Sequence, residues 1–149
     1  HIIDCKRVRV MGNLEKLELL MEMMEEWGII HKDGKNYFPT GSSIDVWSEA
    51  VAYQASLEAD FKRICLQEQG LYNLIWHPVK GFRADKLARF RGIMGMFEDR
   101  KIVFNRYRNF TTMFEELTNF GVSSHDDCVD ALVWLVTGLT RKGKLQLDY

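Results

Sequence analysis

The chain has 149 residues, a formal net charge of −1 and 46% hydrophobic residues. This length is most simply a single domain, residues 1–149, with enough apolar side chains to bury a core, and the composition excludes disordered and fibrous proteins. No window approaches the roughly 18 unbroken apolar residues of a membrane span, and the first residues do not resemble a signal peptide. The three cysteines (Cys5, Cys65 and Cys128) have no CxxC spacing, which indicates a reduced, intracellular compartment rather than a zinc site.

The first half of the chain alternates strand and helix patterns. Apolar and polar residues alternate in HIIDCKRVRV, which predicts a strand over residues 1–10. Apolar residues at helical spacing predict a helix over 14–27, with Asn13 as its cap and Gly28 at its end. Residues 31–43 are rich in turn-forming residues and predict a connection, and IDVWSE predicts a second strand over 44–49.

The second half continues the alternation. The patterns predict strands over 72–76 and 101–104 and helices over 53–69, 84–97, 110–119 and 126–138. Strands that alternate with helices favour an α/β fold. We expect the strands at 1–10, 44–49, 72–76 and 101–104 to share one sheet, with the helices 14–27 and 53–69 packed on it.

Three aspartates stand at the start of the last predicted helix. Asp126, Asp127 and Asp130 precede the apolar run ALVWLV in SSHDDCVDALVWLV. Acidic residues near a helix start can cap free N–H groups and favour the helix dipole, which accounts for one or two of them. Asp130 lies a full turn inside and shares a helix face with Asp126 or Asp127, so the like charges repel unless a cation lies between them. Both a cap and a metal site remain open on spacing alone.

Glu49 adds a carboxylate at the end of a predicted strand, where open α/β sheets often place functional residues. A solvent-exposed strand-edge glutamate is the simpler interpretation when it is taken by itself. Together with the aspartates it forms an oxygen-only ligand set, which suits Mg²⁺ or Mn²⁺ rather than zinc.

A basic segment follows over residues 80–108, with nine Lys and Arg residues against three acidic ones and a local net charge of +6. Such segregation suits a phosphate-backbone partner, although a solvated helix face is an equal alternative. Metal-binding carboxylates beside a basic strip point to phosphodiester chemistry.

Several stretches resemble the nuclease domain of the large terminase subunit of tailed phages and prophages. FTTMFEELTNFGVSSHDDCVDALVWLV (110–136) is similar to the family's E-L-x-x-F helix followed by H-D-D-x-x-D-A-L. DKLARFRGIMGMFEDRKIVF (85–104) is similar to its K-x-x-R segment, acidic turn and strand, although the glycine usual before that strand is replaced near Arg100. DVWSEAVAYQASL (45–57) is similar to the strand that carries the family's central acid. The matches run in the expected order over residues 44–136.

The resemblance implies an RNase H-like mixed sheet flanked by helices, of the integrase and resolvase type. It implies a Mg²⁺- or Mn²⁺-dependent endonuclease that cuts concatemeric viral double-stranded DNA during genome packaging, with two ions on the order of 4 Å apart. Glu49, Asp127 and Asp130 are then the catalytic acids and metal ligands, with Asp126 as a further candidate ligand or the cap. Lys80, Arg83, Lys86 and Arg89 are the expected DNA-binding residues.

The resemblance also implies a context for the domain. The expected partners are the ATPase part of the large terminase subunit, the small terminase subunit and the portal, in the cytoplasm of a bacterial host. In the family the first catalytic aspartate lies on an opening strand ahead of the strand that residues 1–10 resemble. The 149 residues hold no GxxxxGK[ST] motif, so we expect the chain to be the C-terminal part of a larger subunit that carries the ATPase. The alternative function is a module that docks DNA or the portal without cutting, with the aspartates acting as helix caps.

Overall fold

The computed structural model describes residues 1–9, 12–49, 54–79, 86–122 and 125–141. The chain divides into two compact units, one formed by residues 9–81 and the other by residues 1–8 with 82–149. Each unit has its own core of buried apolar residues.

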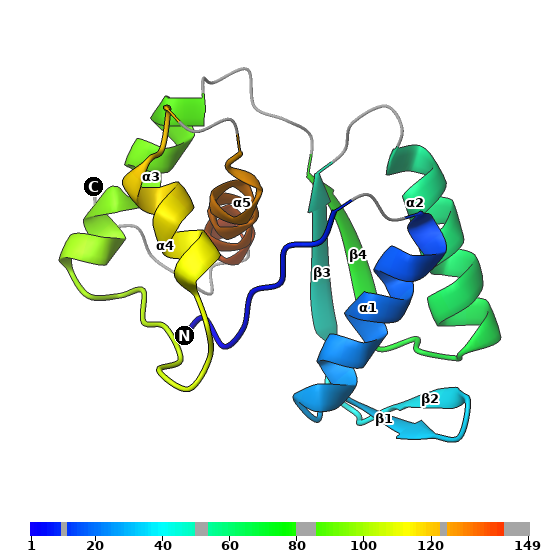
Figure 1. Ribbon diagram of the computed structural model, residues 1–149. Coiled ribbons are helices and arrows are strands. Elements are labelled where there is room, and N and C mark those ends of the chain that lie inside the picture. The colour runs from blue at the N-terminus through cyan, green and yellow to red at the C-terminus, as the bar shows by residue number, and fades with distance from the viewer. Residues whose placement is uncertain (10–11, 50–53, 80–85, 123–124, 142–149) are drawn as a thin grey trace. The chain divides into compact units, whose positions relative to one another are not determined.

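The first unit, residues 9–81, places helices on one face of a parallel strand pair (Figure 1). Its elements are α1 (Asn13–Glu26), β1 (Ile30–Asp33), β2 (Asn36–Pro39), β3 (Ile44–Glu49), α2 (Gln54–Phe61), the π-helix η1 (Lys62–Glu68) and β4 (Leu74–Val79). β3 and β4 pair in parallel from Ile44 opposite Leu74 to Glu49 opposite Val79. The helical crossover α2–η1 makes this pairing possible, because parallel neighbours need a long connection.

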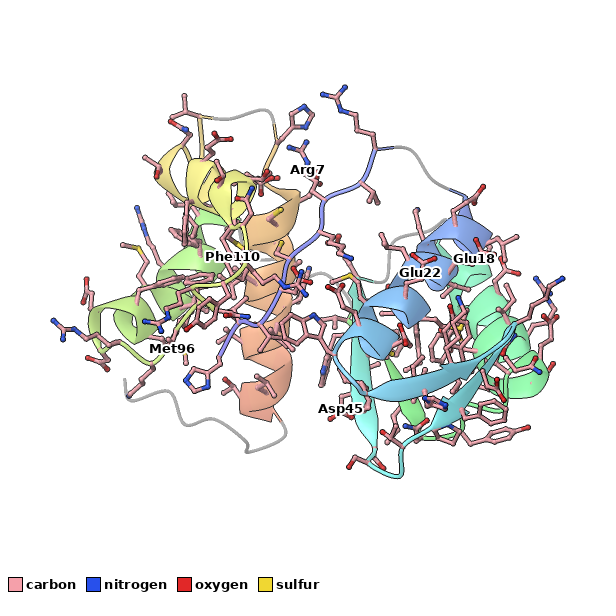
Figure 2. The ribbon with its side chains drawn as sticks, turned by 60° about the horizontal axis from the view of Figure 1, so that its bottom comes forward. Arg7, Glu18, Glu22, Asp45, Met96 and Phe110 are labelled. Atoms are coloured by element: carbon pink, nitrogen blue, oxygen red, sulfur yellow. The ribbon has the colours of Figure 1, made fainter. Side chains whose placement is uncertain are left out.

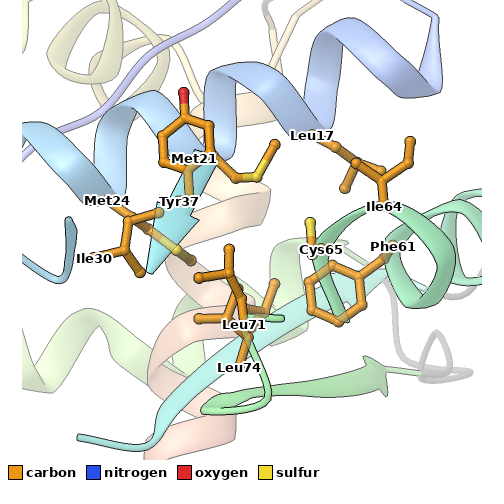
Figure 3. Packing of buried hydrophobic residues seen from close by; sticks show 11 residues of the cluster. Leu17, Met21, Met24, Ile30, Tyr37, Phe61, Ile64, Cys65, Leu71 and Leu74 are labelled. Carbon is orange, nitrogen blue, oxygen red and sulfur yellow. The ribbon is translucent and has the colours of Figure 1, made fainter. Parts of the chain in front are cut away.

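The core of this unit joins the helices to the strands. Leu17 and Met21 of α1, Phe61 of α2 and Leu74 of β4 are all buried in one cluster with Val46 of β3. Figure 3 shows several of these side chains converging between α1 and the strand layer. The predicted packing of helices 14–27 and 53–69 on the strands is therefore confirmed.

Two sequence predictions in this unit need correction. Residues 31–43 were expected to be a connection, but they contain most of an antiparallel hairpin, in which β1 pairs with β2 from Ile30 opposite Pro39 to Asp33 opposite Asn36. Gly34 supplies the positive φ (59°) that a two-residue hairpin loop requires. Asn13 is the first helical residue rather than the cap, and its Nδ2 instead donates to Asp60 Oδ2 at 2.8 Å.

The second unit is mainly helical and contains α3 (Lys86–Glu98), α4 (Thr111–Thr118) and α5 (Asp127–Arg141). Its core joins one face of each helix, with Met96 from α3, Met113 from α4, and Val129 and Leu132 from α5 among its buried members. The predicted helices 84–97, 110–119 and 126–138 are confirmed to within a few residues over the described part of the chain.

The predicted strands 1–10 and 101–104 are reduced to one parallel bridge, between Ile2 and Phe104. Local hydrogen bonds explain why the ladder stops. The Asn105 carbonyl accepts from the Arg108 N–H at 3.1 Å, and the Tyr107 N–H donates to Asn105 Oδ1 at 3.1 Å, so the two groups that the next ladder step would use are engaged in a local turn. The described residues form two two-stranded sheets in place of the single predicted four-stranded sheet.

Arg100 adopts the left-handed conformation that usually requires a glycine at the end of a helix, here α3. Its φ is 57°, the only positive value among the non-glycine residues that the structure describes. The Arg100 N–H donates to the Phe97 carbonyl and the Lys101 N–H to the Met96 carbonyl, at 3.0 and 2.8 Å. This is the Schellman pattern, whose left-handed residue is usually glycine. It lies where the resemblance led us to expect a glycine.

Candidate active site

Glu49 is the last residue of β3, at the carboxyl end of the parallel pair. Side chains alternate between the faces of a strand, so Val46 points into the core while Asp45, Trp47 and Glu49 share the opposite face. The structure thus places Glu49 at the edge where open α/β sheets carry their functional groups.

A histidine lies on the same face, and the sequence analysis did not identify it. Trp47 pairs with His77 in the β3–β4 register, and their rings stack with centroids 4.4 Å apart at an interplanar angle of 20°. The His77 Nε2 atom is 2.7 Å from Asp45 Oδ1. The signal available in the sequence was a polar His77 inside the apolar run LIWHPV.

The three aspartates lie where the sequence predicted, at the start of α5. Asp126 directly precedes the first helical residue, Asp127, and its carbonyl accepts the first helical hydrogen bond from the Asp130 N–H at 2.9 Å. Asp126 therefore occupies the N-cap position. Asp127 and Asp130 lie in the first turn, where the helix dipole favours negative charge.

Glu116 of α4 satisfies the start of α5, a role that the sequence analysis did not foresee. Its side chain is only 4% exposed, and its Oε2 accepts from the N–H groups of Cys128 and Val129 at 2.7 and 3.2 Å. These are two of the four N–H groups that a helix start leaves without intrahelical partners. The E-L-x-x-F motif that supported the resemblance thus has a structural reason for its glutamate.

Arg7 supplies the positive charge at this acidic helix start. Its Nη1 is 3.6 Å from Glu116 Oε1, and its Nε is 3.4 Å from Asp127 Oδ2. Figure 2 labels Arg7 on the N-terminal segment beside the start of α5. The repulsion expected from the sequence between the aspartates is therefore reduced by a side chain of the protein itself.

A cavity of about 360 Å³ opens beside this cluster. Three residues of α4 line it together with the C-cap residue of that helix and two further residues, and the lining is Arg7, Thr112, Glu115, Glu116, Asn119 and His125. His125 of the H-D-D motif therefore lies at this cavity with the residues that hold the helix start.

The thiol of Cys128, between the aspartates, is protonated at neutral pH in the metal-free protein. Burial raises its pKa to about 12, with the neighbouring Cys5 thiol and Glu116 acting in the same direction. A thiol with that pKa stays protonated, whereas metal binding and nucleophilic attack require the thiolate.

The expected DNA-binding residues are only partly described. Lys86 and Arg89 are residues of α3, three positions apart in the sequence. Lys80 and Arg83 lie outside the described residues. Whether these four residues bind DNA stays a prediction.

The metal site also stays a prediction. Within the described ranges, no group of three or more His, Cys, Asp or Glu side chains is close enough to hold an ion. Glu49 belongs to one unit, and Asp127 and Asp130 belong to the other. The structure therefore gives the geometry of the glutamate and that of the aspartates separately. The donor chemistry fits Mg²⁺ or Mn²⁺, because the candidate ligands are all carboxylates.

The terminase RNaseH-like domain family matches residues 16–138 of the chain. This range includes both parts of the candidate site, and it covers most of the sequence. The chain belongs to this family, and its fold class is RNase H-like α/β. No curated protein and no solved structure matches the chain.

Family membership supports a terminase role of the nuclease type and implies a DNA substrate in the context of a packaging motor. In the described part of the chain no helix is both long enough and apolar enough to cross a membrane.

Proposed function

We propose that this protein is a Mg²⁺- or Mn²⁺-dependent endonuclease that cuts concatemeric viral double-stranded DNA during genome packaging. The observation that carries the proposal is the family match, whose range contains a strand-end glutamate and a helix-start pair of aspartates. The proposed setting is the bacterial cytoplasm, with the ATPase part of the large subunit, the small terminase subunit and the portal as partners.

In the proposed mechanism, Glu49, Asp127 and Asp130 would hold two divalent ions through their carboxylates. Such ions would supply Lewis-acid activation of a water and charge stabilisation at the leaving 3′ oxygen. Asp130 would complete the ligand set from the first turn of α5. Glu116 and Arg7 position the aspartates, since Glu116 fixes the helix start and Arg7 bridges Glu116 and Asp127.

The test is cleavage of supercoiled plasmid DNA by the purified chain, alone and with the family's opening strand added at the N-terminus. We expect nicked and linear products with Mn²⁺ and none with EDTA, and heat-denatured protein serves as the control for contaminating nuclease. An absence of metal-dependent cleavage in both proteins would count against the proposal.

One observation favours the alternative, a DNA- or portal-docking module that does not cut. Arg7 already pairs with Asp127, and Glu116 already caps α5, so the acidic cluster has a structural role without a metal. A docking module binds DNA equally well with Mn²⁺ and with EDTA, and it leaves the plasmid supercoiled.

The basic residues of α3 give a prediction that both functions share. Replacing Lys86 and Arg89 together with alanine should weaken DNA binding and lower the slope of log K against log salt by about 2, because about 0.9 counterions are released per phosphate contact. Fluorescence anisotropy from 50 to 200 mM salt measures both quantities. An unchanged salt slope would show that the basic segment is a solvated helix face that does not contact DNA.

A further inference from the structure

The face of β3 and β4 that carries Glu49 also carries a histidine with the features of a proton acceptor. His77 is held at two points, by the 2.7 Å contact of its Nε2 with Asp45 and by stacking on Trp47. Each contact restrains a different motion of the ring. The carboxylate restrains rotation within the ring plane, and the indole restrains tilting out of that plane.

The Asp45 contact also fixes which nitrogen of His77 carries the proton. A carboxylate can only accept a hydrogen bond, so the neutral imidazole must present Nε2–H to Asp45. The lone pair is then on Nδ1. Among the described residues, Nδ1 has no hydrogen-bond partner. The same logic, in which a carboxylate sets the tautomer of a histidine, underlies the base of a catalytic triad.

The register places His77 two positions along the sheet from the proposed metal ligand Glu49. Trp47 lies opposite His77, and Glu49 follows Trp47 by two residues on the same face. Strands about 4.8 Å apart with a rise of about 3.3 Å per residue put the Cα atoms of His77 and Glu49 about 8 Å apart. A water or phosphate oxygen held by the Glu49 carboxylate is within reach of a histidine side chain at that separation.

We propose that His77 is the general base of the proposed nuclease site and that Asp45 and Trp47 are its positioning residues. This inference rests on the proposed function. The His77 Nδ1 takes a proton from the attacking water as that O–H bond breaks and the P–O bond forms. The P–O3′ bond breaks, and the 3′ oxygen takes a proton from solvent. His77 then returns its own proton to solvent, and Asp45 stabilises the imidazolium in between.

A purely structural role is the competing explanation. In that explanation the Asp45–His77 contact serves only to hold β3 and β4 together. Its loss would then lower stability and leave turnover unchanged. The variants below separate the two roles because they measure turnover, DNA affinity and folding independently.

The experiment compares His77→Ala and Asp45→Asn with His31→Ala, a matched control on the exposed edge of β1. In the Mn²⁺-dependent plasmid assay, His77→Ala should lower kcat on the order of 100-fold with little change in KM, as for the loss of a general base. Added imidazole should restore turnover to His77→Ala. Asp45→Asn should lower kcat in the same direction, and His31→Ala should match wild type.

A second measurement does not depend on activity. Nitrogen-15 NMR of labelled histidine should show neutral His77 with Nε2 protonated and Nδ1 unprotonated, and Asp45→Asn should abolish that preference. The opposite tautomer in wild type would overturn the inference. So would wild-type cleavage that His77→Ala retains, or a loss in His77→Ala that imidazole does not restore. If the wild-type protein cuts no DNA with Mn²⁺, the proposed function itself is contradicted, and this inference fails with it.

Discussion

Replacing Glu116 with alanine should lower the free energy of unfolding by about 2–4 kcal/mol. The change leaves the N–H groups of Cys128 and Val129 without their acceptor in a buried setting, and each unsatisfied buried group costs about 1–3 kcal/mol. It also removes one of the two carboxylates that Arg7 contacts. Urea unfolding followed by circular dichroism measures the difference.

The neighbouring residue provides the control for Glu116. Glu115 lies on the same helix but is exposed, so Glu115→Ala should change stability by no more than about 0.5 kcal/mol. Glu116→Gln should fall between the two, because its amide oxygen can still accept but carries no charge. Equal stabilities for Glu115→Ala and Glu116→Ala would show that Glu116 does not hold the start of α5.

Replacing Asp127 with asparagine should abolish stabilisation by Mn²⁺ with little effect on the fold itself. The Asp127 side chain is 72% exposed, and its contact with Arg7 is therefore worth at most about 1 kcal/mol. If the aspartates only repelled one another at a metal-free site, Asp127→Asn would raise the melting temperature in EDTA. Arg7 already offsets that repulsion. We expect the melting temperature in EDTA to stay near wild type and the Mn²⁺-induced rise to disappear.

Asp126 gives the contrasting result to Asp127. As the residue at the N-cap position, Asp126→Ala should cost about 1 kcal/mol whether or not Mn²⁺ is present. A scan of both variants by differential scanning fluorimetry, with EDTA and with Mn²⁺, distinguishes cap from ligand. If Asp126→Ala lost the stabilisation by Mn²⁺ and Asp127→Asn kept it, Asp126 would be the metal ligand and Asp127 would not.

The helices were predictable from the sequence because their apolar spacing is long and regular. The helix over 14–27 and the aspartate-led helix over 126–138 each repeat the pattern for three turns or more, and both are present as α1 and α5. The parallel pairing of β3 with β4 follows the same logic, since a long helical segment separates two strand patterns.

The short strands were less predictable. β1 and β2 have four residues each, too few for a reliable alternation, and Gly34 was the main local signal of their turn. Residues 1–10 alternate like a strand, but a turn at Asn105 takes up the Asn105 carbonyl and the Tyr107 N–H, which a longer ladder would need. Such competition depends on contacts that a periodic pattern does not contain.

The parts of the candidate site that sequence reasoning missed all depend on tertiary contacts. Glu116 was recognised as part of a motif, but its burial against the start of α5 requires α4 and α5 to be packed together. Arg7 lies more than a hundred residues from Asp127 in the chain. The His77–Asp45 contact depends on the register of a parallel pair, which no local pattern specifies.

A titration with Mn²⁺, followed by the electron paramagnetic resonance signal of the free ion, tests the central claim most directly. The claim is that Glu49 and the α5 aspartates hold the same divalent ions. Wild type should bind Mn²⁺, and both Glu49→Gln and Asp127→Asn should weaken that binding by at least the roughly 10–100-fold loss seen on changing outer-shell partners of a metal. Glu22→Gln, an exposed change on α1 (Figure 2), should bind as wild type does. An unchanged isotherm for Glu49→Gln, or no binding by wild type at millimolar Mn²⁺ with the family's opening strand supplied, would contradict the account.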